Sequence, residues 1–193
     1  MKRRSITALL ALALSLSMVL TACKSDSGTA DNSGNKAADS AKGEIQSSEA
    51  VFGAFESETL EGEAVTEDIF SQADLSMVNI WGTFCGPCIE EMPALGELGR
   101  QYADKGVQVI GLIGDVDKAG DETALEIVEK TKADYTHLIA SPTLQLGILS
   151  KVRVFPTTIF VDKDGNQVGD VYSGARDQET WTEITEALLK EVQ

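Results

Sequence analysis

The tetrapeptide Cys85-Gly86-Pro87-Cys88 is the strongest chemical signal in the chain. Two cysteines separated by two residues can close and reopen a disulfide ring, which is the chemistry of dithiol–disulfide exchange. An apolar run precedes the pair and a helix is expected after it, so Cys85 lies at a helix N-terminus, where free N–H groups and the helix dipole lower a thiol pKa. We therefore expect Cys85 to be the nucleophile and Cys88, one turn later, to be the resolving cysteine. Gly86 and Pro87 set the tight start of the helix.

These cysteines could serve three other purposes. A zinc site needs two further ligands, and His137 with a carboxylate is a poor candidate set without a second Cys-x-x-Cys, so no metal is expected. A purely structural disulfide across one turn removes little chain entropy. A peroxidase of the peroxiredoxin type would carry Thr or Ser three residues before its cysteine, where Gly82 stands. These residues therefore favour dithiol–disulfide exchange.

The elements that must position the pair belong to one domain, residues 51–193. Short apolar runs predict strands, whereas apolar residues at helical spacing predict helices. Strands are expected at Phe52–Glu56, Glu63–Thr66, Ser76–Trp81, Val107–Gly114, Tyr135–Ala140, Thr157–Val161 and Gln167–Tyr172. Helices are expected from Cys85 to Lys105, over Glu122–Lys132, and after an N-cap at Asp177, where Trp181, Ile184, Leu188 and Val192 recur. This alternation predicts an α/β fold, a three-layer α/β/α sandwich with a mixed central sheet.

Two local details follow from the same patterns. Asp164-Gly165 between the last two strands predicts a type I′ hairpin turn. On the middle helix, Leu125, Val128 and the aliphatic part of Lys132 are expected to form the buried face.

Composition narrows the function further. The chain has 193 residues, of which 42% are hydrophobic, so it can bury a core. It carries 31 acidic against 16 basic residues, for a net charge of −15. Binding to nucleic acid requires clustered Lys and Arg, so a nucleic-acid partner is not expected.

The N-terminal residues predict export. A basic start, Met1–Arg4, precedes an apolar stretch from Ile6 to Leu20, as in a signal peptide of residues 1–22. Leu20-Thr21-Ala22-Cys23 resembles the lipobox of bacterial lipoproteins, which implies a lipid on Cys23; an ordinary cleaved signal is the alternative. Residues 23–50 are rich in Ser, Gly, Ala and Asp and predict a flexible tether. The expected location is extracytoplasmic, lipid-anchored to the cell membrane, with a Gram-positive surface favoured.

The segment from Trp81 to Pro93, with Cys85-Gly86-Pro87-Cys88 followed by Glu90-Glu91-Met92-Pro93, resembles the membrane-anchored thioredoxin-like reductases of the TlpA/ResA type. The resemblance covers residues 51–193. It implies a thioredoxin fold with an N-terminal β-hairpin and a central helix–strand insertion between Glu122 and Ala140.

The resemblance also implies roles for single residues. Glu91 matches the acidic residue placed beneath the cysteines for proton transfer, the alternative being a solvated helix Glu such as Glu90. Pro156, in Val154-Phe155-Pro156-Thr157, matches the cis-proline that faces the redox pair, the alternative being a trans proline. Asn79 stands where cytosolic thioredoxin has a buried Asp, so that proton route is missing.

A substrate-contacting rim is expected around the pair. Its members are Trp81, Phe84, Gly86, Pro87 and Phe155, the last through its backbone. Trp81 is better suited to core packing than to direct participation. Phe84 replaces the tryptophan that usually precedes the nucleophile.

The direction of electron flow follows from the dipeptide between the cysteines. Gly-Pro is the thioredoxin pair, with a potential of about −270 mV, whereas a strong oxidant such as DsbA lies at about −120 mV. A reductase of exported proteins is therefore expected, with no cofactor beyond the Cys85–Cys88 disulfide. The family implies apocytochrome c or methionine sulfoxide reductases as substrates and a CcdA- or DsbD-type transporter as donor. A monomer is expected. A disulfide oxidase, or a non-redox tethered binding or chaperone-like module, is the alternative.

Overall fold

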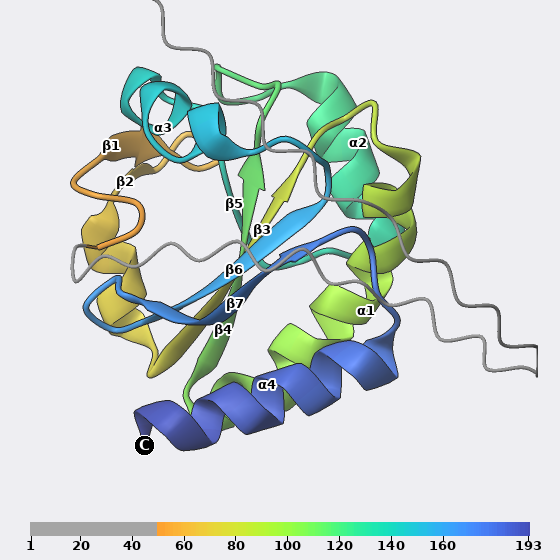
Figure 1. Ribbon diagram of the computed structural model, residues 1–193. Coiled ribbons are helices and arrows are strands. Elements are labelled where there is room, and N and C mark those ends of the chain that lie inside the picture. The colour runs from red at the N-terminus through yellow and green to blue at the C-terminus, as the bar shows by residue number, and fades with distance from the viewer. Residues whose placement is uncertain (1–49) are drawn as a thin grey trace, which may run out of the picture. The chain divides into compact units, whose positions relative to one another are not determined.

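The computed structural model describes residues 50–193, in which five strands form one central sheet (Figure 1). Their order is β5-β4-β3-β6-β7. The strands are β3 (Leu75–Trp81), β4 (Val107–Ile113), β5 (Thr136–Leu138), β6 (Thr157–Asp162) and β7 (Gln167–Ser173). The first three run parallel, and β6 and β7 pair antiparallel. The expected mixed sheet is confirmed.

Strand β3 is central, and most of its side chains are apolar on both faces. All seven of its residues are buried, which is the pattern of a strand covered on both sides. It pairs with β4 from Leu75↔Val107 to Trp81↔Ile113, and with β6 from Leu75↔Asp162 to Ile80↔Thr157. Both β3 and β4 therefore end at the same edge of the sheet.

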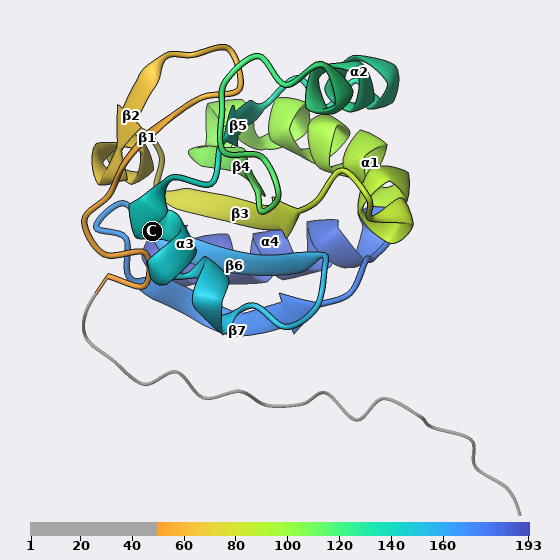
Figure 2. The ribbon, with the colours of Figure 1, turned by 90° about the horizontal axis from the view of Figure 1, so that it is seen from above.

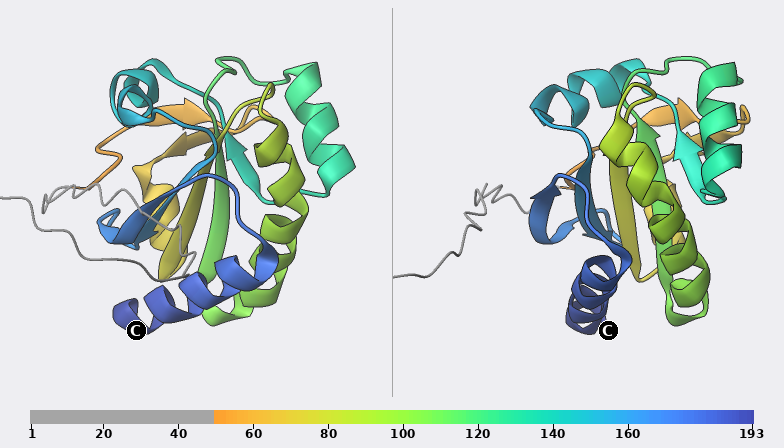
Figure 3. Two further views of the ribbon diagram at one scale, coloured as in Figure 1. Left: turned by 45° about the vertical axis from the view of Figure 1, so that its right-hand side comes forward. Right: turned by 90° about the vertical axis from the view of Figure 1, so that its right-hand side faces the viewer.

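Helices cover one face of this sheet, and shorter segments cover the other (Figures 1 and 2). On the first face lie α1 (Gly86–Tyr102) and α4 (Gln178–Val192), which pack side by side (Figure 3). Helix α2 (Glu122–Thr131) packs against α1. On the other face lie the β1–β2 hairpin (Glu56–Glu58 and Ala64–Thr66), the 3₁₀ turns η1 (Glu67–Gln72) and η3 (Leu149–Lys151), and α3 (Pro142–Leu146). A third 3₁₀ turn, η2 (Ala103–Lys105), continues α1. The three-layer sandwich is confirmed.

The local predictions need four corrections. The first strand was expected at Phe52–Glu56, but β1 begins only at Glu56 and ends at Glu58. Only Gly165 of the Asp164-Gly165 pair has positive φ, and the Gly165 N–H bonds to the Asp162 carbonyl, so this is a three-residue loop and not a type I′ turn. The buried residues of α2 are Ala124 and Thr131; of the expected face, Val128 is half-buried against the core, whereas Leu125 and Lys132 are exposed. Helix α3 and turn η1 were not predicted, because each is too short to show a period.

No helix within residues 50–193 is long and apolar enough to cross a bilayer. The predicted signal peptide, the lipidation site at Cys23 and nearly all of the predicted tether lie outside the described residues.

Candidate active site

The two cysteines lie where β3 gives way to α1. Cys85 is the N-cap residue of α1 and is joined to Cys88 by a disulfide. The Cys85 Sγ also accepts a hydrogen bond from the Cys88 N–H at 3.3 Å, so a free N–H of the first turn points at this sulfur. Cys85 is 6% exposed and Cys88 is fully buried. Of the two cysteines, the less completely buried one is the one predicted to be the nucleophile.

A carboxylate holds the loop that leads into the pair. Asp115 accepts hydrogen bonds from the Thr83 backbone N–H at 3.0 and 3.1 Å and from the Thr83 hydroxyl at 2.6 Å. Asp115 follows β4, so the end of one parallel strand fixes the loop at the end of its neighbour. A Cβ at Gly82 would lie 2.8 Å from the Phe84 ring and 3.3 Å from the Asp115 carboxylate, so a larger residue there would have to displace the exposed Phe84 ring.

An apolar rim surrounds the disulfide. The Phe84 side chain is 70% exposed, and its ring contacts that of Phe155 edge-on at 5.8 Å between centroids. The Phe155–Pro156 peptide bond is cis, as expected, and Phe155 packs against the cluster that contains both cysteines. Gly86 and Pro87 are exposed at the start of α1. Phe84, Gly86, Pro87 and Phe155 thus lie where a substrate chain would have to approach; their contact with substrate stays a prediction.

Trp81 is not part of this rim. Its side chain is fully buried, and its indole N–H donates to the Nδ1 of His137 at 3.2 Å. The expectation that Trp81 contacts substrate is wrong, because the alternation along β3 points this residue into the core under the helices.

His137 is likewise a structural residue. Its Nε2 lies 2.9 Å from the Ala133 carbonyl, which can only accept, so Nε2 carries the proton and Nδ1 accepts from Trp81. Burial lowers the pKa of His137 to about 4, so the ring is neutral at neutral pH. Among residues 50–193, no cluster of His, Cys, Asp and Glu has the arrangement of a metal site.

Glu91 is buried beneath the redox pair. It occupies a position of the buried stripe of α1, three residues after Cys88, and is 4% exposed. Its carboxylate accepts hydrogen bonds from Asn79 Nδ2 at 2.9 Å, the Arg176 backbone N–H at 3.0 Å and Trp181 Nε1 at 3.2 Å. Burial raises the Glu91 pKa, and these three bonds oppose the rise. Its neighbour Glu90 is exposed, so the two adjacent glutamates differ as expected.

Sequence reasoning missed the partners of Glu91. Asn79 and Thr158 are register neighbours on β3 and β6, and the Asn79 Nδ2 bonds to the Thr158 hydroxyl at 3.0 Å as well as to Glu91. Trp181 and Arg176 are 90 and 85 residues away from Glu91 along the chain. A signal for Asn79 was available, since a polar amide in a mostly apolar, fully buried strand requires a buried partner.

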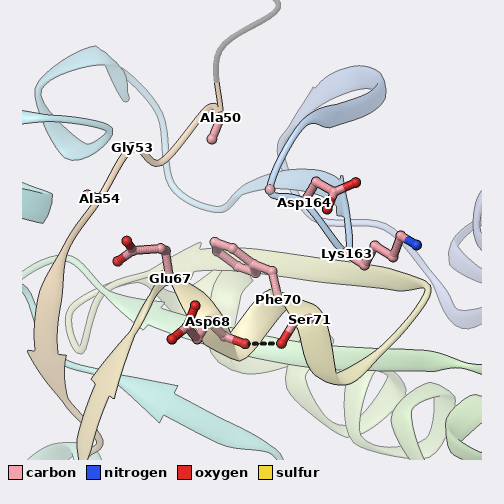
Figure 4. Close-up of a pocket in the computed structure, with 10 residues that line it drawn as sticks. Ala50, Gly53, Ala54, Glu67, Asp68, Phe70, Ser71, Lys163 and Asp164 are labelled. Carbon is pink, nitrogen blue, oxygen red and sulfur yellow. Dashed lines mark hydrogen bonds between the residues drawn. The ribbon is translucent and has the colours of Figure 1, made fainter.

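A separate pocket lies at the other end of the sheet (Figure 4). Its volume is about 550 Å³, and it is formed by the segment before β1, by η1 and by the β6–β7 loop. Its lining residues include Glu67, Phe70 and Lys163 but neither cysteine. Inside it, the Ser71 hydroxyl donates to the Asp68 carbonyl at 2.7 Å. The pocket is therefore distinct from the redox site.

The family described as Redoxin matches residues 34–189, which is most of the chain. The chain belongs to the Redoxin family. Within it, similarity to ResA proteins and the observed fold support a ResA/TlpA-like protein of the thioredoxin family. The position of the cysteine pair at the start of α1 is consistent with that membership.

Two named relatives are similar to this chain in sequence. It is 36% identical over 94 residues to the thiol-disulfide oxidoreductase ResA of Bacillus cereus, covering 47% of this chain and 50% of that protein. It is 32% identical over 134 residues to the thiol:disulfide interchange protein DsbE of Pseudomonas fluorescens, covering 67% and 68%. The chain thus spans about half the length of the first of these relatives.

Solved structures share the architecture. A thiol:disulfide interchange protein from Chlorobium tepidum aligns with a TM-score of 0.60 at 21% identity, covering 70% of this chain and 93% of that one. StoA from Bacillus subtilis aligns with a TM-score of 0.54 at 19% identity, covering 70% and 98%. At these identities the likeness concerns the fold alone, and it confirms the thioredoxin fold.

Proposed function

We propose that this protein is an extracytoplasmic, membrane-tethered thiol–disulfide oxidoreductase that reduces disulfides in exported proteins. The observation that carries the proposal is the Cys85–Cys88 pair at the N-terminus of α1, with the Glu91 carboxyl buried in the same helix. A reactive pair next to a buried titratable group is the arrangement that two successive thiol–disulfide exchanges require.

In the first exchange the Cys85 thiolate attacks one sulfur of a substrate disulfide. A bond forms between that sulfur and the Cys85 Sγ, and the other substrate sulfur leaves as a thiolate. The helix N-terminus favours this step because its N–H groups stabilise negative charge on the Cys85 sulfur. The product is a mixed disulfide between the two proteins.

In the second exchange Cys88 must lose its proton before it can attack. We assign Glu91 as the group that takes this proton, because burial raises its pKa toward neutral pH and so makes the carboxylate a stronger base. The Cys88 thiolate then attacks the Cys85 sulfur, the Cys85–Cys88 disulfide closes and the second substrate thiolate leaves. The substrate has gained two electrons, and this protein has lost them.

The substrates are expected to be exported proteins with disulfides to reduce, such as apocytochrome c or a methionine sulfoxide reductase. Regeneration of the dithiol needs a donor, for which a CcdA- or DsbD-type membrane thiol transporter is the candidate. The apolar rim of Phe84 and Phe155 supports contact with a polypeptide rather than with a small polar molecule.

The test is the reduction potential of the Cys85–Cys88 pair, by equilibrium titration. A reductase requires about −220 mV or below, in or beyond the range of the glutaredoxins. A value near about −120 mV, that of a strong oxidant, would make the protein a disulfide oxidase.

Anchoring is tested separately from chemistry. Cys23→Ala should release the protein from the membrane fraction while the purified variant keeps its exchange activity, because the lipid and the redox pair are independent. A variant that stays with the membrane would contradict the lipid anchor.

A non-redox binding role is the remaining candidate. The double variant Cys85→Ser, Cys88→Ser keeps the rim but has no exchange chemistry. Full function in the cell without these thiols would favour a tethered binding or chaperone-like module, whereas loss of function supports the oxidoreductase.

A further inference from the structure

All three hydrogen-bond partners of Glu91 donate to it. The Arg176 backbone N–H and the Trp181 indole N–H bond to Oε2, and the Asn79 amide bonds to Oε1. Donors suit a carboxylate, but a protonated carboxyl needs an acceptor for its own O–H. A backbone N–H and an indole N–H can never accept. Asn79 is the one partner that has an acceptor to offer.

That acceptor is unused in the structure. Asn79 is fully buried, and its Nδ2 donates both to Glu91 and to the Thr158 hydroxyl, at 2.9 and 3.0 Å. Its Oδ1 is buried without any hydrogen-bond partner. An orphaned buried carbonyl costs about 1–3 kcal/mol, so its presence calls for an explanation.

A half-turn of the amide supplies the explanation. It exchanges the positions of Nδ2 and Oδ1, after which Oδ1 faces both Glu91 and Thr158. The Thr158 hydroxyl both donates and accepts, so it suits either orientation. In either orientation one end of the amide lacks a hydrogen-bond partner, so the two orientations do not differ in that respect. The protonation state of Glu91 therefore decides between them, because a carboxylate needs a donor and a carboxylic acid needs an acceptor.

We propose that Asn79 is a positioning residue whose amide turns over with the protonation of Glu91: Nδ2 donates to the carboxylate, and Oδ1 accepts from the carboxylic acid. This rests on the proposed role of Glu91 in proton transfer. The proton moves from the Cys88 thiol to Glu91 and later to the departing thiolate or to solvent. Asn79 neither gains nor loses a proton, and it gives Glu91 a matched partner in both states.

The other polar and charged groups around Glu91 do not duplicate this role. The Arg176 guanidinium stacks 5.1 Å from the Trp181 ring and carries donors only. The Tyr135 hydroxyl can accept as well as donate, but it is buried without a hydrogen-bond partner and so is not bonded to Glu91. Cys88 is the proton source and is fully buried.

The decisive experiment is infrared spectroscopy of the full chain with ¹³C in its asparagine side-chain carbonyls. Lowering the pH through the titration of Glu91 should move the Asn79 carbonyl band to lower frequency, because an unpaired carbonyl gains two hydrogen bonds. Asn79→Leu assigns the band, and Asn79→Ser serves if that variant does not fold. Glu91→Gln should abolish the pH dependence.

A fixed Asn79 band while the Glu91 carboxyl titrates would overturn the proposal. The kinetics give a second readout: Asn79→Leu should slow resolution of the mixed disulfide about tenfold or more at pH 7, and Thr158→Val should slow it less. An Asn79→Leu variant that resolves at the wild-type rate also contradicts the proposal. Neither result touches the reduction potential, so failure here is distinguishable from failure of the proposed function.

Discussion

Two titratable side chains are buried beneath the redox end of the sheet, and burial has opposite consequences for them. His137 on β5 has one donor and one acceptor facing its two ring nitrogens, which is the set that a neutral imidazole requires. Glu91 on α1 has three donors facing it, which suit the charged form, while burial favours the neutral one. His137 is therefore held in its neutral protonation state, whereas opposing influences act on the protonation of Glu91.

The difference shows that burial alone does not mark a functional group. The partners of His137 and its burial both favour the same protonation state, so it can only stabilise the fold. The partners of Glu91 oppose its burial, which brings its two protonation states closer in free energy. A group that must take up and release a proton in each reaction cycle needs that balance.

The largest expected effect tests the structural side of this comparison. His137→Leu leaves the Trp81 indole N–H and the Ala133 carbonyl without partners, at a cost of about 1–3 kcal/mol for each orphaned group. We expect a loss of about 2–6 kcal/mol in the free energy of unfolding, measured by denaturant titration. The pH profile of exchange should keep its shape, and a changed profile would show that His137 takes part in the chemistry.

The pH dependence of stability should show the two groups with opposite signs. The pKa of His137 is about 4 in the fold against 6.5 in the unfolded chain, so below about pH 6.5 the unfolded state binds the proton and stability falls. The loss is complete below about pH 4 and is on the order of 3 kcal/mol. Glu91 has a raised pKa in the fold, so its contribution improves stability as the pH falls.

Denaturant titrations from pH 4 to 8 separate these contributions. The wild type should lose stability over the His137 window, and His137→Leu should lack that part of the slope. An unchanged slope in His137→Leu would mean that other groups cause the acid sensitivity.

The next effect concerns catalysis. Glu91→Gln removes the proton acceptor, and general base catalysis is worth about 100-fold or more, part of which water can replace. We expect resolution of the mixed disulfide to slow about 10- to 100-fold at neutral pH, measured by stopped-flow. Glu90→Gln changes the adjacent exposed residue in the same way and should have no effect. Equal rates in the two variants would refute the assignment of Glu91.

The smallest expected effect concerns the contribution of a nearby charge to the Glu91 pKa. The positive charge of Arg176 lowers the Glu91 pKa as the weakest of the four influences that oppose burial. Arg176→Ala keeps the backbone N–H bond but removes the charge, so the inflection in the pH profile of exchange should move slightly upward. Lys163→Ala removes the same charge in the loop at the far end of the sheet and should leave the inflection in place. A downward shift in Arg176→Ala would contradict the electrostatic account.

Much of the fold and of the site was predictable because its signals are local. The buried run of β3, the cysteine pair at the start of a helix and the Asp177 cap of α4 each depend on a few consecutive residues. Helix α3 and turn η1 were missed for the same reason, since five or six residues show no reliable helical period. Asp164 and Gly165 predicted the correct hairpin with the wrong turn, because Asp162 also bonds the backbone N–H groups of Asp164 and Asn166 and so favours a longer loop.

Trp81 shows that closeness to the cysteines along the sequence does not by itself predict contact with substrate. It is four residues from the nucleophile, yet strand alternation points it inward to His137, a residue 56 positions away. Asn79 was interpreted as a lost proton route, and the structure instead bonds it to Glu91.

The sequence by itself determined the chemistry, because the type and spacing of Cys85 and Cys88 and their place at a helix start are properties of one short segment. The tertiary structure decided which polar groups surround that chemistry. Glu91 bonds to Asn79, Trp181 and the Arg176 backbone. These contacts form only because α1 and α4 pack together on the face of the sheet that contains β3, which brings residues up to 90 positions apart within hydrogen-bond distance. The balance of charge and burial at Glu91 depends on that packing, since desolvation and hydrogen bonding act only through neighbours in space.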